Sequence, residues 1–443
     1  MTKFTKISLG FIIFALPLQI VSFYVGFSII LVRIFFLASF FIAVLLMLLK
    51  GELNIPKTYI GFNILLLLIA NFIITLFAID VLLSFKDALL QMFIIFFFYY
   101  SYWLLNTEKS LDFAINSYIY MALIISMYGV FQQIGFLLGW DTNIPFLDYF
   151  SYNESLKDPS SKDWAMEEIS SFFIRIRGTF FDTNTFAGYI VSAFGLAITK
   201  LIYSYKEKIA RGKLKFWVII IIFLMTILLT MSRSALVGLF LLFLVILFYY
   251  HKELFGRFLW LKILTPFVVV AIFGILLIPD LLDLIIGVFT SFGMNNKNPL
   301  RTKSTMLHLQ IALQGVEMFI ENPLTGVGLN NFRINYSHSN HLWYTGITNK
   351  NMMAHSVFLS FFSEGGIIGA LANYSVIGTI ILKSHIRIKT IISPHNKSLM
   401  VGIFAAYIGI LGSNIFYQYY LNEFVWFLAA ANVAAFYVFK PDD

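Results

Sequence analysis

The sequence predicts an all-α polytopic membrane protein with about 12 transmembrane helices. Of its 443 residues, 59% are hydrophobic and only 12% are charged. The mean hydropathy is +0.84, so the chain carries more apolar surface than water could cover. The apolar runs are continuous, without the alternation of an outer-membrane barrel, which favours helices over strands.

Each predicted helix is an apolar run near the length of about 20 residues that crosses the hydrocarbon core. The predicted spans are residues 8–28, 31–49, 58–79, 88–105, 113–138, 182–203, 216–231, 234–250, 259–279, 355–382, 398–416 and 424–439. No small-residue cleavage site follows the first run, so we interpret it as a span and not as a signal peptide.

The spans form one integral membrane domain over residues 1–443 with two long outer loops, at residues 140–181 and 280–354. With both termini in the cytoplasm, most of the 31 Lys and Arg residues lie in cytoplasmic segments, as the positive-inside rule requires. The segment 200–215 is the strongest such anchor. The net charge of +8 therefore reflects topology and contact with anionic membrane lipid, and it does not indicate nucleic-acid binding.

Residues 302–320 of the second loop predict an amphipathic helix. Leu309, Leu313 and Val316 share one face of this helix, whereas Gln310 and Gln314 share another. Such a helix lies on the membrane surface or packs on the bundle.

The composition predicts no metal site and no cofactor. The chain has no cysteine, and its 7 histidines show no spacing typical of metal ligands.

The most informative polar cluster runs from Arg175 to Gly188, where the first outer loop enters a span. Arg175 and Arg177 place two permanent charges at the membrane interface, which suits a diphosphate. Gly178 would let the backbone approach a phosphate closely. The alternative is that both arginines are interfacial anchors whose charged ends reach water.

A second cluster, Ser232, Arg233 and Ser234, forms a tight outer turn between two spans. Both spans are short, so Arg233 lies at or slightly inside the interface, where an unpaired charge is costly. A carboxylate or a bound phosphate would satisfy it. The alternative is a helix-capping turn with Ser232 as the N-cap.

Two further clusters follow on the outer side. Residues 322–332 hold a turn with Gly326 and Gly328. His355 opens a span, and an interfacial histidine suits a general base near neutral pH. Glu364 lies deeper in the same span, where burial would raise the pKa of its carboxyl group. The alternative for His355 and Glu364 is a structural hydrogen bond.

Taken in order, these four clusters resemble the bacterial O-antigen ligase and polymerase family. That family has an Arg-x-x-Gly segment followed by Asn, a Ser-Arg-Ser turn, a Pro-x-x-Gly-x-Gly turn, and a His-Asn that opens a helix with Glu-x-Gly-x-x-Gly. The residues that fit are Arg175, Gly178, Asn184, Ser232, Arg233, Ser234, Pro323, Gly326, Gly328, His355, Glu364, Gly366 and Gly369.

The chain departs from the family pattern at two places. Ser356 stands where the family has Asn after the His. The family also places an Arg at the start of the helix before the Pro-Gly turn, and the candidates for that position here are Arg301, Lys303 and His308.

The resemblance implies a GT-C-like glycosyltransferase of the bacterial inner membrane that uses no metal and no nucleotide sugar. Its donor would be a glycan on undecaprenyl diphosphate, and its acceptor a second glycan or lipid A-core, with a chain-length regulator as a further partner. We assign Arg175, Arg177 and Arg233 to the diphosphate and His355 to the acceptor hydroxyl. We place Gly178, Asn184, Arg301, Gly326, Gly328 and Glu364 among the substrate-binding residues.

Three other functions stay open at this point. A ligase and a polymerase differ only in the acceptor, and we favour a polymerase because Ser356 departs from the His-Asn pair. A transporter or flippase for lipid-linked glycans should show inverted repeats and broken helices, and the sequence shows neither. A purely structural membrane scaffold is the last alternative.

Overall fold

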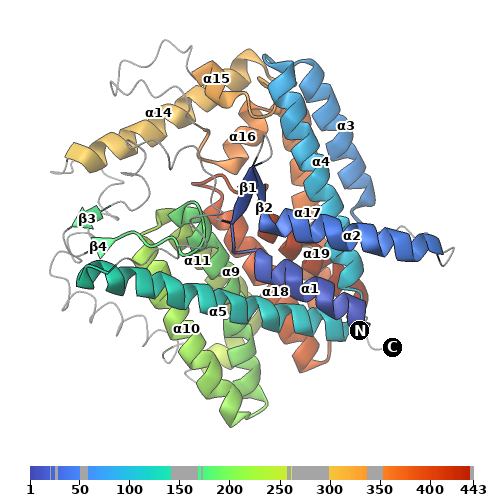
Figure 1. Cartoon of the computed structure of the whole chain (residues 1–443), viewed down its shortest axis with the longest axis vertical. Coiled ribbons are helices and arrows are strands. Elements are labelled where there is room, and N and C mark those ends of the chain that lie inside the picture. Colours follow the sequence, from blue (N-terminus) through green and yellow to red (C-terminus); the bar gives the residue numbers. More distant parts are fainter. Residues whose placement is uncertain are drawn as a thin grey trace.

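The structure is a computed structural model that describes residues 1–19, 21–24, 28–49, 58–140, 168–170, 173–256, 261, 299–336 and 353–439. The described helices, shown in Figure 1, are α1 (Lys3–Ala15), α2 (Leu31–Leu49), α3 (Gly61–Leu76), α4 (Val81–Leu104), α5 (Glu108–Leu138), α9 (Thr183–Lys206), α10 (Ala210–Thr230), α11 (Arg233–Gly256), α14 (Pro299–Glu321), α15 (Phe332–Tyr336), α16 (Val357–Ser363), α17 (Gly366–Thr390), α18 (Pro394–Ser413) and α19 (Glu423–Val438). The described strands form two short antiparallel pairs, β1 (Ser22–Tyr24) with β2 (Ser28–Ile30) and β3 (Glu168–Ser170) with β4 (Phe173–Ile174).

These helices confirm the predicted fold class, an all-α polytopic membrane protein. Eight of the described helices are long and apolar enough to cross a membrane, and α3 and α19 are shorter apolar helices. Together they correspond to every predicted span except the first, at 8–28, and the ninth, at 259–279. The ninth lies outside the described residues.

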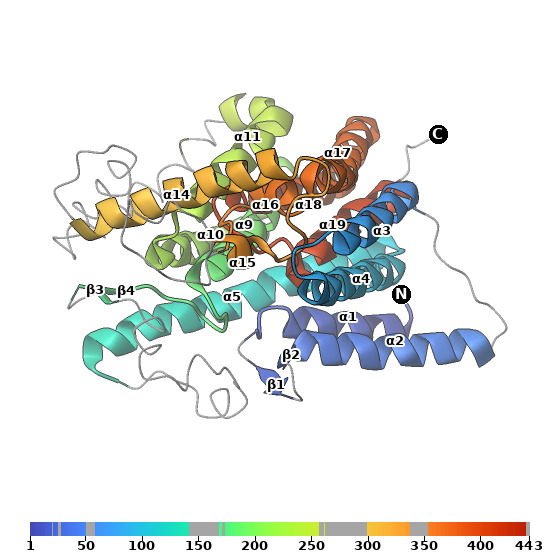
Figure 2. The same cartoon turned by 90° about the horizontal axis from the view of Figure 1, so that it is seen from above.

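Helix α9 forms the centre of the bundle. Its most apolar stretch is 100% buried inside the protein, whereas that of α2 is only 17% buried. Small residues let α18 approach α9 closely, since a Cβ on Gly195 would lie 3.2 Å from the backbone N of Ala406. Figure 2 shows α1 and α2 side by side at one edge of the molecule, where α2 leaves much of its apolar surface open to lipid.

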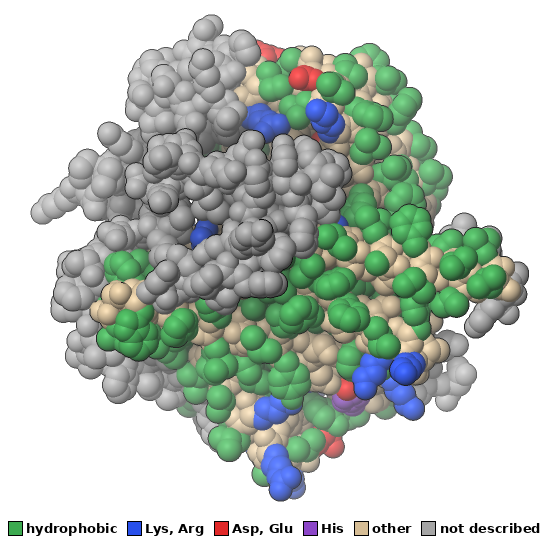
Figure 3. Space-filling model, viewed as in Figure 1, with side chains coloured by type: hydrophobic (Ala, Val, Ile, Leu, Met, Phe, Trp, Pro, Cys, Tyr) green, Lys and Arg blue, Asp and Glu red, His purple; other side chains and the backbone are tan. Residues whose placement is uncertain are grey.

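The surface is consistent with a membrane environment. On the face shown in Figure 3, hydrophobic side chains cover most of the described surface, and the visible Lys and Arg side chains gather mainly near its upper and lower ends. A protein surrounded by water would carry charged side chains over its whole surface, because these side chains keep it soluble.

The first predicted span, residues 8–28, is wrong. Helix α1 ends at Ala15, and Leu16 caps it. Pro17 follows, and a proline inside a helix removes a hydrogen bond and clashes with the preceding turn. The chain then enters the β1–β2 pair, because an apolar run alone does not distinguish a helix from strands.

The predicted span at 355–382 is also wrong as a single helix. Helix α16 ends at Ser363, Glu364 caps it, and α17 begins at Gly366. The φ of Gly366 is 59°, in the left-handed region that glycine adopts at no steric cost.

A turn at residues 322–328 fills the break between α16 and α17. Four backbone hydrogen bonds of 2.8–3.1 Å join the two segments, from the N–H groups of Val327, Gly328, Ile367 and Ile368 to the carbonyls of Ser363, Glu364, Pro323 and Leu324, respectively. These bonds satisfy backbone groups that the interrupted helix leaves open.

The helix predicted at 302–320 is confirmed as α14, and its described apolar face turns outward. Leu313 and Ile320 are 62% and 70% exposed, whereas Gln310 and Gln314 are buried. The inner side packs on α16, because a Cβ on Gly315 would lie 2.7 Å from Leu359. Helix α14 therefore packs on the bundle through its inner side, and its exposed apolar face is free to contact the membrane surface.

Candidate active site

The segment before α9 holds the two arginines of the first cluster in an extended conformation. Its backbone is fixed by α5, since the Ile174 N–H donates to Gln133 Oε1 at 3.2 Å and the Gly178 N–H donates to Gln132 Oε1 at 2.9 Å. Ile174 and Ile176 are buried. Arg175 and Arg177, which alternate with them, are only half-buried. Side chains on extended backbone alternate between two sides, so both arginines lie on the side away from the core.

The Ser-Arg-Ser turn lies beside this segment. Met231 ends α10 in a left-handed conformation with a φ of 50°, and α11 begins at Arg233. Ser232 Oγ accepts the Ala235 N–H at 3.3 Å, as a helix N-cap does. The predicted capping role of Ser232 is therefore present. Arg175 Nε donates to the Thr230 carbonyl at 3.1 Å, which joins the first cluster to the end of α10.

Asn184, in the first turn of α9, connects the two clusters. Its Oδ1 atom accepts hydrogen bonds from Arg175 Nη2 at 3.3 Å and from Ser232 Oγ at 2.8 Å. Its Nδ2 atom donates to Asp182 Oδ1 at 3.2 Å. The amide oxygen thus faces the cationic side of the site, and the amide nitrogen faces the acidic side.

Tyr417 joins this network from the segment between α18 and α19. Its hydroxyl lies close to the side chains of Asp182 and Asn184. Burial raises the pKa of Tyr417 above its ordinary value, and the charge of Asp182 raises it further. The phenol therefore stays protonated beside the carboxylate and the amide.

His355 lies next to Tyr417, with 6.1 Å between the two ring centroids. The Val357 N–H donates to the Asn414 carbonyl at 3.0 Å, which holds the start of α16 against the end of α18. The φ of His355 is 47°, a strained value for a residue other than glycine. Burial lowers the pKa of His355, and the charge of Asp182 opposes that effect, so the imidazole is neutral near pH 7.

Ser356 caps α16, because its side chain accepts the Leu359 N–H at 3.3 Å. Asparagine caps helices as well as serine does. The departure from His-Asn therefore preserves the local fold that presents His355.

The Pro-Gly turn does not join this cluster. A Cβ on Gly326 would lie 2.4 Å from the Glu364 backbone, and one on Gly328 would lie 2.3 Å from Ala78. Both glycines have positive φ, at 62° and 105°. Their N–H groups are bonded to the carbonyls of Asn322 and Glu364. These contacts account for Gly326 and Gly328 by packing, and their predicted contact with substrate stays a prediction.

Gly178 follows the same pattern. Its φ is 56°, a Cβ there would lie 3.0 Å from Phe186, and Gln132 already accepts its N–H. The backbone is thus not open to a phosphate at this residue. The glycine instead lets the arginine segment turn sharply against α5 and α9.

Glu364 also belongs to the turn and not to the arginine network. Its Oε1 accepts the Phe332 N–H at 3.2 Å. It lies between α16 and α17, outside the membrane-spanning helices, and burial raises its pKa to about 8, with a further rise from nearby Asp87. The predicted raised pKa and the structural hydrogen bond are both present.

The remaining predicted residues occupy three positions. Arg233 is the first residue of α11 and is half-buried, next to Ser232. Arg177 is half-buried on the same extended segment as Arg175. Arg301 lies on α14, and its side chain, like those of Lys303 and His308, is outside the described part of the chain.

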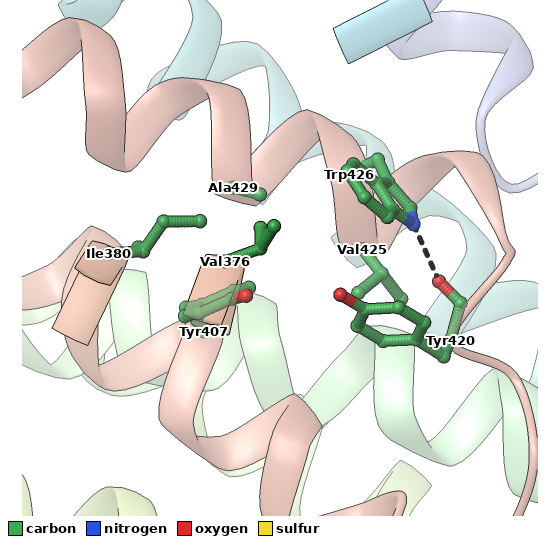
Figure 4. A pocket seen from close by; sticks show the side chains of 7 residues that line it. All are labelled: Val376, Ile380, Tyr407, Tyr420, Val425, Trp426 and Ala429. Atoms are coloured by element: carbon green, nitrogen blue, oxygen red, sulfur yellow. Dashed lines mark hydrogen bonds between the residues drawn. The ribbon is translucent and has the colours of Figure 1, made fainter. Parts of the chain in front are cut away.

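Within the described residues, the other features of the bundle offer no competing site. No group of three or more His, Asp or Glu side chains there could hold a metal ion. A small pocket between α17, α18 and α19 is almost entirely apolar, and Trp426 Nε1 beside it donates to the Tyr420 carbonyl at 2.9 Å (Figure 4). None of the predicted site residues lines it. Its lining residues are Val376, Ile380, Tyr407, Tyr420, Val425, Trp426 and Ala429.

Sequence reasoning missed Asp182 and Tyr417. Asp182 precedes the first turn of α9 and accepts the Asn184 and Thr185 N–H groups at 3.0 and 2.7 Å, so its position before Thr-Asn-Thr signals an N-cap. Tyr417 belongs to no motif, and only the packing of α18 against α9 brings it to the site.

Arginines, an imidazole and a carboxylate thus meet at the ends of membrane-spanning helices, in a polytopic α-helical membrane protein. Residues 218–374 match the family model described as O-antigen ligase. This match supports the predicted resemblance to the O-antigen ligase and polymerase family over that part of the chain. A comparison with curated proteins finds no match. The matched range includes Arg233, His355 and Glu364, but the Arg175 segment and Tyr417 lie outside it.

Proposed function

We propose that this protein is an inverting glycosyltransferase that moves a glycan from undecaprenyl diphosphate to an acceptor hydroxyl at the outer leaflet of the bacterial inner membrane. The observation that carries the proposal is the meeting of Arg175, Asn184 and Ser232 in one hydrogen-bonded network. Asn184 extends this network to Asp182, whose charge acts on His355. The family match supports a lipid-linked glycan as the substrate class.

The reaction requires one bond to form and one to break. The acceptor oxygen attacks the anomeric carbon, the bond from that carbon to the diphosphate oxygen breaks, and the diphosphate leaves with the electron pair. His355 takes the acceptor proton, which suits an imidazole that burial keeps neutral.

The developing charge falls mainly on the leaving diphosphate. Fixed cations stabilise such a charge without reorganising during the reaction. Arg175 is held in place by the Thr230 carbonyl and Asn184, and Arg233 opens α11 beside the same network. A cation at a helix N-terminus is unfavourable with the helix dipole, and a bound anion would compensate it. In this proposal the arginines perform the electrostatic role that a metal has in other transferases.

For the acceptor we propose a second lipid-linked repeat unit, so that the protein acts as a surface-polysaccharide polymerase. The alternative is a ligase that transfers the glycan to lipid A-core, and the family match is compatible with either acceptor. The polymerase prediction depends on the replacement of the family's Asn by Ser356. Because Ser356 caps α16 as an asparagine would, this replacement is weaker support for a polymerase. The acceptor assay below distinguishes the two.

The test uses the full-length protein, purified and reconstituted in lipid nanodiscs. Lipid-diphosphate-linked repeat units are supplied alone or with lipid A-core, and the products are separated by gel and by mass. Chain growth without lipid A-core supports the polymerase, and transfer only to lipid A-core supports the ligase. No product with either acceptor, together with movement of the intact lipid-linked glycan across a vesicle membrane, would contradict the transferase and favour a flippase.

A further inference from the structure

Asp182 contributes a carboxylate to the region between the arginine network and His355. Its two oxygens accept the Asn184 and Thr185 N–H groups that begin α9, and the Thr185 hydroxyl also donates to it. Its charge acts on His355 and on Tyr417. The carboxylate therefore does more than cap a helix, because two other elements of the chain present ionisable groups to it.

Tyr417 lies between the two halves of the site. Its ring lies beside the His355 ring, tilted by 49°. The segment that carries Tyr417 packs on the first turns of α9, because a Cβ on Gly188 would lie 2.1 Å from the Tyr419 hydroxyl. The Tyr417 hydroxyl thus lies close to Asp182, at the start of that helix. Asn414, at the end of α18, fixes one end of the segment that carries Tyr417 by accepting the Val357 N–H. At the other end, Glu423 is 2% exposed and pairs with Arg33 at 2.7 Å. A phenol held at both ends in this way has a defined position against the imidazole.

The charges that face this group come from separate elements. Asp182 acts on His355 from the start of α9, and Arg175 acts on Tyr417 from the extended segment before it. Tyr417 itself is neutral, so the carboxylate is the charge that favours a protonated imidazole.

We propose that Asp182 and Tyr417 are positioning residues of the transfer reaction, in which the carboxylate stabilises the imidazolium that forms on His355 and the phenol holds carboxylate and imidazole in register. The inference rests on the proposed role of His355 as the base. In the reaction the acceptor O–H bond breaks, its proton binds an imidazole nitrogen, and the positive charge formed there faces the negative charge of Asp182. The proton returns to solvent after the product leaves, so Asp182 stays ionised throughout.

The test is the pH profile of transfer by the full-length protein in nanodiscs with lipid-diphosphate-linked repeat units, for wild type, Asp182→Asn and Tyr417→Phe. Asparagine caps a helix as well as aspartate, so Asp182→Asn removes the charge and keeps one acceptor oxygen for the N–H groups that begin α9. Asp80→Asn is the matched control, because Asp80 caps α4 through the Leu83 N–H at 2.9 Å and lies outside the site.

In wild type we expect the rate to rise with pH as His355 loses its proton. Asp182→Asn should reduce the plateau rate about 10-fold or more and move this rise to lower pH by about one unit, because a lost negative charge lowers the histidine pKa. Tyr417→Phe should move the rise in the same direction by less. Asp80→Asn should match wild type.

A second measurement does not depend on turnover. The full-length protein is labelled with 13C-histidine, its ring signals are followed by NMR across the same pH range, and His355→Gln assigns the His355 signal. A lower pKa of His355 in Asp182→Asn supports the inference, and if that variant does not fold, Tyr417→Phe decides. If the variants are active and neither their pH profiles nor the His355 pKa differ from wild type, the inference is overturned, whereas the proposed function still stands. An inactive wild type would instead count against the proposed function.

Discussion

Ser232 Oγ donates a 2.8 Å hydrogen bond to Asn184 Oδ1 across a sequence separation of 48 residues. This contact brings two motifs together that the sequence could only place in order. The same oxygen of Asn184 also accepts from Arg175, so the turn before α11 and the segment before α9 share one acceptor.

The first prediction concerns the arginines. Arg175→Ala and Arg233→Ala should each reduce transfer by about 100-fold or more, because each would remove a fixed charge from the leaving diphosphate. Arg175→Lys and Arg233→Lys should recover little, since an ammonium cannot reproduce a planar fork of donors. Product formed per folded molecule is measured, with exposed Arg211→Lys as the control. Near-normal turnover in both lysine variants would show that these residues are interfacial anchors.

The second prediction concerns orientation in the membrane. The chain has no native cysteine, so single cysteines report their side directly. An impermeant thiol reagent added to intact cells should label positions 140 and 324, where Trp140 and Leu324 are 57% and 65% exposed. It should not label position 211 or 389, where exposed basic residues mark the cytoplasmic side. Labelling at position 211 would show that this segment lies outside the cell and that the predicted topology is wrong.

The third prediction concerns the Pro-Gly turn. Gly326→Ala should reduce the yield of folded protein and its melting temperature, because its backbone conformation alone costs about 1–2 kcal/mol with a Cβ and the added carbon meets the Glu364 backbone. Gly378→Ala in α17 is the control, since no atom lies within 4 Å of its Cβ position. If both variants melt like wild type, the turn is not the tight junction described above.

The fourth prediction concerns pH and stability. The folded-state pKa of Glu364, about 8, lies above the ordinary value of 4.5, so the fold favours the protonated carboxyl group. This contribution is full below pH 4.5 and is lost as the pH rises towards about 8. The melting temperature of wild type should fall over that interval, and Glu364→Gln should flatten the fall. The control is Glu321→Gln at an exposed position, which should leave the pH dependence of the melting temperature as in wild type. If both variants change it equally, the pH dependence does not come from Glu364.

The fifth prediction concerns metal ions. If arginines stabilise the leaving group, excess chelator should leave the transfer rate within about twofold of the untreated protein. The rate is compared in chelator, in Mg²⁺ and in Mn²⁺ on the same nanodisc sample. A loss in chelator that Mg²⁺ restores would place a metal in the reaction.

The sequence predicted the long helices well, because apolar runs such as those of α2 and α9 have the length of a membrane span and few internal breaks. It failed where a local feature interrupts such a run. Pro17 ends α1, and the left-handed Gly366 separates α16 from α17. The mean hydropathy of a long apolar run hardly changes with one such residue, whereas a single proline or left-handed glycine is enough to end a helix.

The candidate site was predictable only in part. Arg175, Asn184 and Ser232 belong to motifs with recognisable chemistry, and the structure brings them together. Gly326 and Gly328 looked like ligand-binding glycines, but the atoms that fill the space beside them come from remote segments. Tyr417 carried no local signal, because its contacts with Asp182 and Asn184 arise from tertiary packing.

The contact between Tyr417 and Asp182 has a consequence for how the protein is made. Residues 182 and 417 leave the ribosome at opposite ends of a long interval of synthesis, during which α9, α11 and α17 enter the membrane one after another. A nascent chain that has not yet delivered α18 and the segment after it lacks the phenol beside its imidazole. The junction thus closes only when nearly the whole polypeptide has been inserted, so a truncated or stalled product would have an incomplete centre. Under the proposed function, such a product could not consume lipid-linked intermediates prematurely.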